Sequence, residues 1–322
     1  MTGAALGAMP GAAPEVSVII AAWCAGRTLS QAVGAALAQT GVAVEVIIVD
    51  DASPDDSFAV AEGLADDPRV RAFRLDSNQG PAAARNLALE HASAPWIAVL
   101  DADDLMRPER LSRMLALAHA APADVVLGNL TEIIGHSDHP DAARIEGTFL
   151  PSLDRPTCWD LHSYVMGNLE GGDGKTLGYL KPLISNAFLK RNQVRYTETL
   201  RNGEDFHLVL SCYAAGARVW FSPAADYLYF RHDASVSHRA DPAHLDCLVA
   251  ADRSFAAQQA DPQLRQLMQK RIRQIERLGT AETVMAALRE RRAGRALATL
   301  LGNPAALPRL ARQLSQAVRK RI

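Results

Sequence analysis

The sequence predicts an α/β protein in which a parallel sheet is covered by helices on both faces, followed by a helical C-terminal extension. Three observations lead to this prediction. Apolar runs alternate with helical patterns through the first 130 residues, and the connecting loops are short, which is typical of β-α-β units. The apolar runs are nearly continuous, as expected for strands buried on both faces. Beyond Pro242 only the helical period remains.

The first 100 residues contain four predicted strands separated by three predicted helices. The strands are predicted at Val16–Ala22, Val44–Val49, Val70–Leu75 and Trp96–Leu100. The helices are predicted from the N-cap Thr28 to Gln39, from Ser53 or Asp55 to about Leu64, and from Pro81 to about His91. Because parallel strands end at the same edge of a sheet, residues that follow them should meet there.

The later elements are less regular. A helix is predicted from Pro108 to Ala120, a strand at Val125–Leu127, a helix at Asp205–Ala215, and short strands at Arg218–Phe221 and Asp226–Phe230. Between residues 131 and 178 the pattern weakens, and glycines at 171, 172 and 174 indicate a mobile loop on the substrate side. This loop lacks the strand–turn–helix context of a phosphate-binding loop.

Charge and composition narrow the class of protein. The net charge of −2 over 322 residues gives no reason to expect nucleic-acid binding. Four widely spaced cysteines predict neither a disulfide framework nor a zinc site. The first residues lack the basic region of a signal peptide and no apolar run reaches membrane-spanning length, so we expect a cytoplasmic protein. We predict a disordered N-terminus (1–13), a catalytic domain (14–240) and a helical, basic extension (241–322).

Acidic residues follow two of the predicted strands. Asp50 and Asp51 come after the second strand, and Asp101, Asp103 and Asp104 come after the fourth. Like charges at the end of a buried strand repel one another, and a divalent cation with a phosphorylated ligand would offset this repulsion. Oxygen donors of this kind suit Mg²⁺ or Mn²⁺. The alternative is a polar turn in which Asp104 caps the next helix.

Five segments, in this order, carry a resemblance to a known family. They are Val16–Ala25, Val49–Ser57, Asn78–Leu87, Leu100–Asp104 and Gly203–Phe206. Together they resemble the family 2 glycosyltransferases of GT-A fold over residues 14 to 240. Residues 179–184 and 231–238 resemble, more narrowly, the bacterial exopolysaccharide glucosyltransferases of the succinoglycan type. A dehydrogenase is not favoured, because residues 21–26 do not form its glycine fingerprint.

The resemblance implies a GT-A mixed sheet and a site for a UDP-sugar. Ala21, Ala22 and Trp23 would line the uracil pocket, Asp51 would accept a hydrogen bond from the uracil N–H, and Arg85 would lie near the uridine with Asn86 ordering its loop. Asp101 would hold the ribose or a metal-bound water, and Asp103 would ligate the metal beneath the diphosphate. Two positions depart from the family: Ala21 often is Pro there, and Cys24 often is Asn.

The acceptor side is implied by a second acidic motif. An acceptor hydroxyl attacking opposite the leaving diphosphate needs a base from a segment away from the metal, and direct attack inverts the anomeric centre. Asp205 would be this base, with Glu204 next in line. His238 would be a third metal ligand or would contact the diphosphate; the alternative is an ordinary surface histidine.

The resemblance therefore implies an inverting transferase that moves a hexose, expected to be glucose, to a polyprenyl-diphosphate-linked oligosaccharide. The alternative is a catalytically silent sugar-nucleotide-binding or scaffolding subunit. From Arg289 onward nine basic residues stand against one acid, with leucines among them. This tail predicts either peripheral contact with the inner face of an anionic membrane or a packed helical cap with a solvated basic face.

Overall fold

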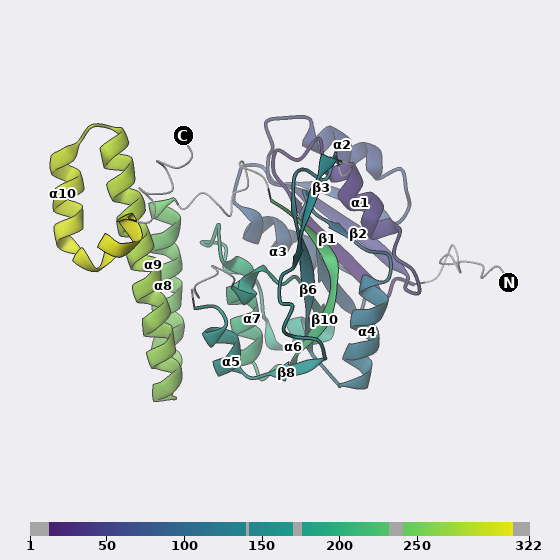
Figure 1. The fold of residues 1–322 in the computed structure, drawn as a ribbon. Helices are drawn as coiled ribbons and strands as arrows, with labels where there is room; N and C mark the ends of the chain where they lie inside the picture. Colours follow the sequence, from purple (N-terminus) through teal and green to yellow (C-terminus); the bar gives the residue numbers. More distant parts are fainter. Residues whose placement is uncertain (1–12, 140–141, 170–175, 232–240, 312–322) are drawn as a thin grey trace. The chain divides into compact units, whose positions relative to one another are not determined.

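A computed structural model describes residues 13–139, 142–169, 176–231 and 241–311 (Figure 1). The chain divides into two compact units. The first unit, Met1–Leu161 with Leu177–Asp233, contains the sheet. The second unit, His162–Thr176 with Ala234–Ile322, is helical in the part that the structure describes. The predicted disordered N-terminus lies outside the described residues except for its last position.

The first half of the sheet consists of parallel strands joined by helices, which confirms the predicted β-α-β units. The strands are β1 (Val16–Ala22), β2 (Val44–Asp50), β3 (Val70–Arg74) and β4 (Trp96–Val99). The connecting helices are α1 (Leu29–Leu37), α2 (Ser57–Leu64) and α3 (Pro81–His91). The strand order is β3-β2-β1-β4, with every neighbour parallel. The residues that follow β2 and β4 therefore lie at one edge of the sheet.

The second half makes the sheet mixed. Its strands are β9 (Pro182–Ser185), β6 (Val125–Ile134), β10 (Val219–Arg231) and β5 (Leu105–Met106), with β7 (Arg144–Thr148) beside β6 and β8 (Thr157–Trp159) beside β10. Strand β9 runs antiparallel to both β4 and β6. Its helices are α4 (Arg110–Ala120), α6 (Asn186–Asn192) and α7 (Glu204–Ala214), with a short 3₁₀ turn at Leu177–Tyr179.

Strand β10 corrects one prediction. The sequence indicates two short strands, whereas the structure has one strand of 13 residues with a register shift between Ser222 and Tyr227. Pro223 lies in this shift. Because proline has no N–H to donate to the ladder, it interrupts the local pairing and the apolar pattern without ending the strand.

The core of the first unit lies between the sheet and its helices. All seven residues of β2 are buried, and helix α3 packs against β1 and β2. The face of α3 toward the sheet consists of small side chains, and Ala82, Ala84 and Ala88 are fully buried. Small residues allow a helix to approach a sheet closely. This close approach brings Arg85, on the same helix, to the carboxyl edge of the strands.

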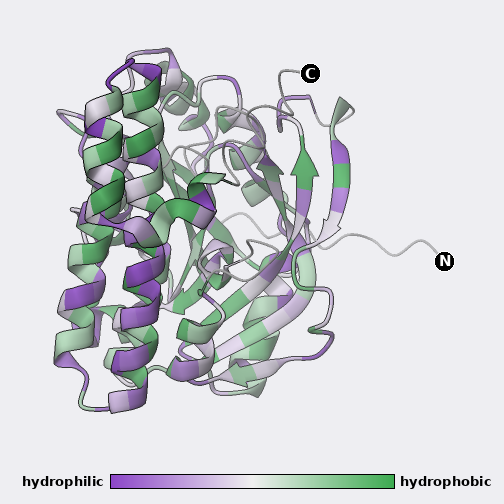
Figure 2. Ribbon diagram, turned by 60° about the vertical axis from the view of Figure 1, so that its left-hand side comes forward, coloured by the Kyte–Doolittle hydropathy of each residue, from purple (hydrophilic) through white to green (hydrophobic). Residues whose placement is uncertain are grey.

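The second unit is built from α8 (Pro242–Gln258), α9 (Pro262–Arg289) and α10 (Ala293–Gly302), with a 3₁₀ turn at Pro304–Ala306 and most of α5 (Leu161–Met166). Figure 2 shows hydrophobic and hydrophilic residues alternating along its helices, as expected for amphipathic packing. One core cluster consists of Ala281, Val284, Ala287, Ala296 and Leu310. None of the helices in the described ranges has both the length and the apolar composition needed to cross a membrane.

The division into units differs from the predicted domain boundary at residue 240 in two respects: the second unit begins at Ala234, and it takes in an earlier segment. Residues 162–176, which the sequence prediction assigned to the catalytic domain, group with the second unit. The guanidinium of Arg271, on α9, donates to the carbonyl of Asn168 and pairs with the buried Asp252 on α8, both at 3.1 Å. Contacts between segments a hundred residues apart leave no trace in the local sequence pattern.

Candidate active site

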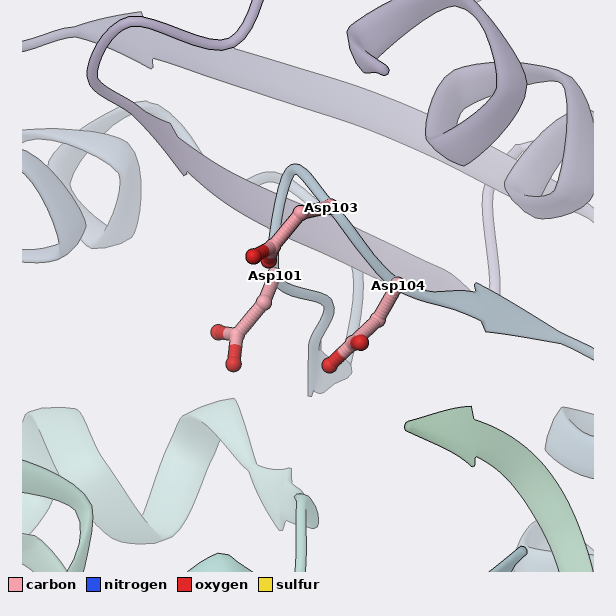
Figure 3. A group of neighbouring side chains, drawn as sticks. All are labelled: Asp101, Asp103 and Asp104. Atoms are coloured by element: carbon pink, nitrogen blue, oxygen red, sulfur yellow. The ribbon is translucent and has the colours of Figure 1, made fainter. Parts of the chain in front are cut away.

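Three carboxylates gather in the turn between β4 and β5 (Figure 3). Each of Asp101, Asp103 and Asp104 offers a carboxylate oxygen, and these oxygens lie within 4.8 Å of one another. Strand β4 ends just before them because charged side chains cannot continue its buried apolar run. The turn therefore brings the predicted acidic residues together at the carboxyl edge of the parallel strands.

Asp104 holds this turn in place. Its carboxylate is buried and accepts hydrogen bonds from the Tyr227 hydroxyl and the Phe230 backbone N–H, each at 2.8 Å. The Tyr227 hydroxyl also accepts from the backbone N–H of Asp101 at 3.1 Å. Burial and the neighbouring carboxylates of Asp103 and Asp101 raise the pKa of Asp104 well above its ordinary value. Asp104 thus ties the turn to β10 and does not cap α4, which begins at Arg110.

Asp51 orders the loop that precedes α3. Its two carboxylate oxygens accept from the Asn78 side-chain amide at 2.9 Å and from the backbone N–H groups of Gln79 and Gly80 at 2.7 and 2.8 Å. Burial raises the pKa of Asp51 in spite of these bonds. A carboxylate has about four lone-pair positions. One position thus remains for a further donor, such as the uracil N–H that the sequence prediction assigned to it.

The end of β1 lies directly beside this acidic loop. Ala22 pairs with Asp50 across the parallel ladder, and the backbone N–H of Asp51 donates to the carbonyl of Ala22 at 2.8 Å. Ala22 is buried, Ala21 is partly exposed and Trp23 is 45% exposed, so Trp23 is the most accessible residue of the predicted pocket wall. Cys24 has a φ of 51°, in the left-handed region, which Asn tolerates better than Cys. The departure from Asn at this position therefore introduces local backbone strain.

Arg85 links the acidic turn to α7. Its guanidinium donates to Asp101 at 2.8 Å and to Glu204 at 2.6 Å, and it lies 3.4 Å from a carboxylate oxygen of Asp205. Burial would lower the pKa of Arg85, but the surrounding acids raise it well above the ordinary value. The neighbouring Asn86 accepts from the Tyr196 backbone N–H and donates to the Tyr196 carbonyl, so it anchors the segment that leads into α7. Arg85 is a buried connector and not a solvated helix residue.

Lys181 makes a second link between the acidic turn and α7. Its ammonium nitrogen lies 2.7 Å from Asp101 and 2.7 Å from Asp205, and the residue is 7% exposed. Burial would lower the pKa of Lys181, but the two carboxylates outweigh this effect and raise it. Because the ammonium stays charged at neutral pH, it neutralises carboxylates from both segments at once.

Asp205 occupies the first turn of α7. Gly203, with a φ of 77°, lets the chain enter the helix so that Glu204 and Asp205 stand at its positive N-terminal end. The Asp205 carboxylate accepts from Lys181 and from the Tyr196 hydroxyl at 3.1 Å. Burial alone would raise its pKa, but Arg85 and Lys181 lower it to about 2. Asp205 is therefore ionised across the physiological pH range.

The structure adds residues that the sequence prediction did not assign a role. Lys181 and Tyr196 contact Asp205 directly, and Arg201 donates to the Asn78 side chain in the loop that Asp51 orders. Lys181 lies within residues 179–184, one of the two segments that resemble the succinoglycan-type transferases, and this resemblance could have indicated its role. Tyr196 and Arg201 lie outside every recognised segment. His238, predicted as a further ligand, lies outside the described residues.

The donor atoms fit a hard divalent cation. Asp103 is half-buried in the turn, Asp101 retains partial exposure, and one oxygen of each carboxylate lies within 4.8 Å of one oxygen of the other. Carboxylate oxygens at this spacing suit Mg²⁺ or Mn²⁺ and not a thiolate-preferring metal. Asp103 and Asp101 would hold the ion, while Asp104 is engaged with β10.

Two curated proteins of Rhizobium meliloti (strain 1021) are similar to this chain over most of its length. The succinoglycan biosynthesis protein ExoO is 36% identical over 313 residues, covering 95% of this chain and 87% of that protein. The succinoglycan biosynthesis protein ExoU is 38% identical over 253 residues, covering 77% of this chain and 72% of that protein.

Solved structures share the fold. A structure of S. aureus TarS 1–349 in complex with UDP-GlcNAc matches with a TM-score of 0.59 and 16% identity, covering 88% of this chain and 90% of that chain. The mannosyltransferase PcManGT from Pyrobaculum calidifontis, in complex with GDP-Man and Mn²⁺, matches with a TM-score of 0.56 and 16% identity. The match covers 96% of this chain and 82% of that chain. These likenesses confirm the GT-A fold. A family model described as glycosyl transferase family 2 matches residues 17–171. Together with the similarity to ExoO and ExoU over most of the sequence, this match shows that the chain belongs to glycosyl transferase family 2.

Proposed function

We propose that this transferase moves a hexose from a UDP-sugar to a growing saccharide in succinoglycan-type exopolysaccharide biosynthesis, with inversion at the anomeric carbon. The main support for this proposal is that two acidic segments distant in the sequence lie close together in the structure. Asp101 and Asp205 are 104 residues apart in sequence, and Lys181 contacts both at 2.7 Å. The names of the two similar Rhizobium proteins support the pathway.

On the donor side, the nucleotide would lie over the carboxyl ends of β1, β2 and β4. Trp23 and the alanines at 21 and 22 would form the wall against the uracil, and Asp51 would accept from the ring N–H. The solved neighbours with UDP-GlcNAc and with GDP-Man and Mn²⁺ support a nucleotide-sugar donor and a divalent ion. When bound, Mg²⁺ or Mn²⁺ would neutralise the charge that develops on the leaving diphosphate. Asp103 and Asp101 would hold this ion.

On the acceptor side, Asp205 would take the proton of the attacking hydroxyl. A carboxylate with a pKa of about 2 is a weak base. The hydroxyl, however, becomes strongly acidic as its oxygen bonds to an oxocarbenium-like carbon, so proton transfer can follow bond formation. Glu204, which faces Arg85 from the same helical turn, is the second candidate for the base. Burial of this network argues against a silent binding subunit, because a scaffold has no need for buried charges that face one another.

The acceptor is proposed to be an oligosaccharide on a polyprenyl diphosphate, which the second unit would approach at the inner face of the membrane. Four leucines around α10 are exposed, namely Leu288, Leu297, Leu301 and Leu307 at 43, 59, 71 and 51%. Exposed arginines lie among them at Arg289, Arg291, Arg292 and Arg295. Apolar and basic side chains exposed on the same short segment suit an anionic lipid surface. Leu310 instead packs in the core cluster, so part of the predicted tail is a helical cap.

Vesicle flotation tests this contact. Truncation at residue 288 is unsuitable, because it would remove Ala296 and Leu310 from the core cluster. The double variant Leu297→Ser/Leu301→Ser keeps the cluster and removes exposed apolar area. We expect it to float less than wild type on anionic vesicles, and we expect wild-type flotation to weaken with salt. Equal flotation of the two proteins, or dimerisation that the variant abolishes, would overturn the lipid contact.

The donor assignment is tested by measuring UDP release from a panel of UDP-sugars with Mn²⁺, Mg²⁺ or a chelator. We expect metal-dependent release from a UDP-hexose, with UDP-glucose the most active. The matched control is Asp103→Asn, which keeps the shape of the side chain and removes its charge. Release that is independent of both the metal and Asp103 would contradict the proposed function.

A further inference from the structure

We propose that Lys181 is a resident counter-cation of this site, a positioning residue that competes with a divalent metal ion for Asp101 while nucleotide is absent and that fixes Asp205. This inference rests on the proposed metal-dependent function and goes beyond it, because it concerns how metal binding is made dependent on the nucleotide. It is carried by the contacts of one buried ammonium group.

The fold places Lys181 with little freedom. It precedes β9, and Leu183 of that strand pairs with Ala98 of β4, so Lys181 stands level with the end of β4 where Asp101 begins the acidic turn. Its carbonyl accepts a hydrogen bond from the buried guanidinium of Arg110 at 3.1 Å. The backbone of Lys181 is thus held on one side and its ammonium on the other. The antiparallel insertion of β9 beside β4 is what brings a lysine to this position.

Both oxygens of Asp101 are already engaged by cations. Arg85 donates to one oxygen at 2.8 Å, and Lys181 lies 2.7 Å from the other. A divalent ion that coordinates Asp101 must displace one of these groups or accept repulsion from it. Of the two, Lys181 is suited to yield, because its ammonium is a point charge on a flexible stem and can leave Asp101 while it keeps its contact with Asp205. The Arg85 guanidinium is a rigid fork that holds Asp101 and Glu204 together.

A nucleotide diphosphate changes the competition between the divalent ion and Lys181 for Asp101. It brings its own negative charge and its own oxygen ligands, so the ion no longer depends on Asp101 alone, and a displaced ammonium gains a new anionic neighbour. The ion and the nucleotide should therefore bind cooperatively, and by linkage each should raise the affinity of the other by the same factor. Lys181 sets the size of that factor because it weakens the binding of the ion when the nucleotide is missing.

The test measures free Mn²⁺ by electron paramagnetic resonance, with and without UDP. Lys181→Met alone is strongly destabilising, because it leaves Asp101 and Asp205 without their shared cation. The decisive protein is therefore Lys181→Met/Asp205→Asn, which removes one positive and one negative charge and leaves the net charge of the network unchanged. Lys181→Arg keeps the positive charge. Lys190→Met, an exposed lysine on α6, controls for the loss of a distant positive charge.

We expect the double variant to bind Mn²⁺ alone about tenfold more tightly than wild type. With UDP present its affinity for Mn²⁺ should change less, so the cooperativity factor falls. Lys181→Arg and Lys190→Met should resemble wild type. The inference is overturned if the double variant binds Mn²⁺ alone no more tightly than wild type while wild type binds the Mn²⁺–UDP pair normally. If wild type does not bind Mn²⁺ even with UDP, the proposed metal-dependent function fails, and this inference fails with it.

Discussion

Replacing Asp205 by asparagine separates the two roles of this carboxylate, in stability and in catalysis. The amide keeps the size of the side chain and can still accept from the Tyr196 hydroxyl, but it has no charge for Lys181 and Arg85. The pKa of Asp205 lies at about 2, compared with 3.8 for an unperturbed aspartate. This difference corresponds to about 2 kcal/mol of stability. Because the folded pKa is depressed, the contribution is complete above pH 4 and is lost as the pH falls toward 2.

We therefore expect Asp205→Asn to lower the free energy of unfolding by about 2 kcal/mol at pH 7, with a difference from wild type that shrinks between pH 4 and pH 2. Turnover should fall by about 10²–10⁴-fold if Asp205 is the base, while donor affinity is retained. Urea unfolding at several pH values gives the first quantity. Sugar transfer and UDP calorimetry give the second. Glu204→Gln is the matched control on the same helical turn.

Three results would each contradict a separate part of this reasoning. A stability difference that does not change with pH would show that the ion pairs with Lys181 and Arg85 do not depress the pKa of Asp205 in solution. Near-wild-type transfer by Asp205→Asn, together with a large loss in Glu204→Gln, would move the role of base to Glu204. Loss of donor binding in Asp205→Asn would instead show that the carboxylate belongs to the donor site.

Three further predictions concern single residues. Asp103→Ala should make UDP affinity independent of Mn²⁺ without altering the fold, which calorimetry with and without the ion would show; unchanged metal dependence would remove Asp103 from the metal site. Gly80→Ala should destabilise the protein by about 1–3 kcal/mol in urea, because Gly80 has a φ of 97° and an added Cβ would lie 3.3 Å from the Arg201 side chain; a change under 0.5 kcal/mol would contradict this strain. Arg271→Met should lower the thermal stability of the second unit by about 3–5 kcal/mol, because it leaves the buried Asp252 without its cation; an unchanged melting transition would show that the pair is dispensable.

The parallel half of the sheet could be predicted from the sequence. Strands β1, β2 and β4 are short apolar runs between helical segments, as burial on both faces requires. Strand β3, at the edge of the sheet, is only partly buried and carries two arginines. The acidic residues at 51, 101 and 103 could be assigned to one edge for the same reason, since parallel strands end together. The five segments in order were enough to identify the family, which the extended similarity to ExoO and ExoU shows.

The partners of these acidic residues could not be predicted from the sequence, because they come from segments distant in the chain. Asp104 looks like Asp101 and Asp103 in the sequence, yet it is buried against Tyr227 and Phe230 because β10 passes beside the turn. Lys181 becomes part of the site because β9 inserts antiparallel beside β4. Asp205 is ionised and held because residues from α3, from the segment before β9 and from the segment before α7 converge on it. A local pattern records whether a residue is buried, but the identity of its partners depends on contacts between segments distant in the chain.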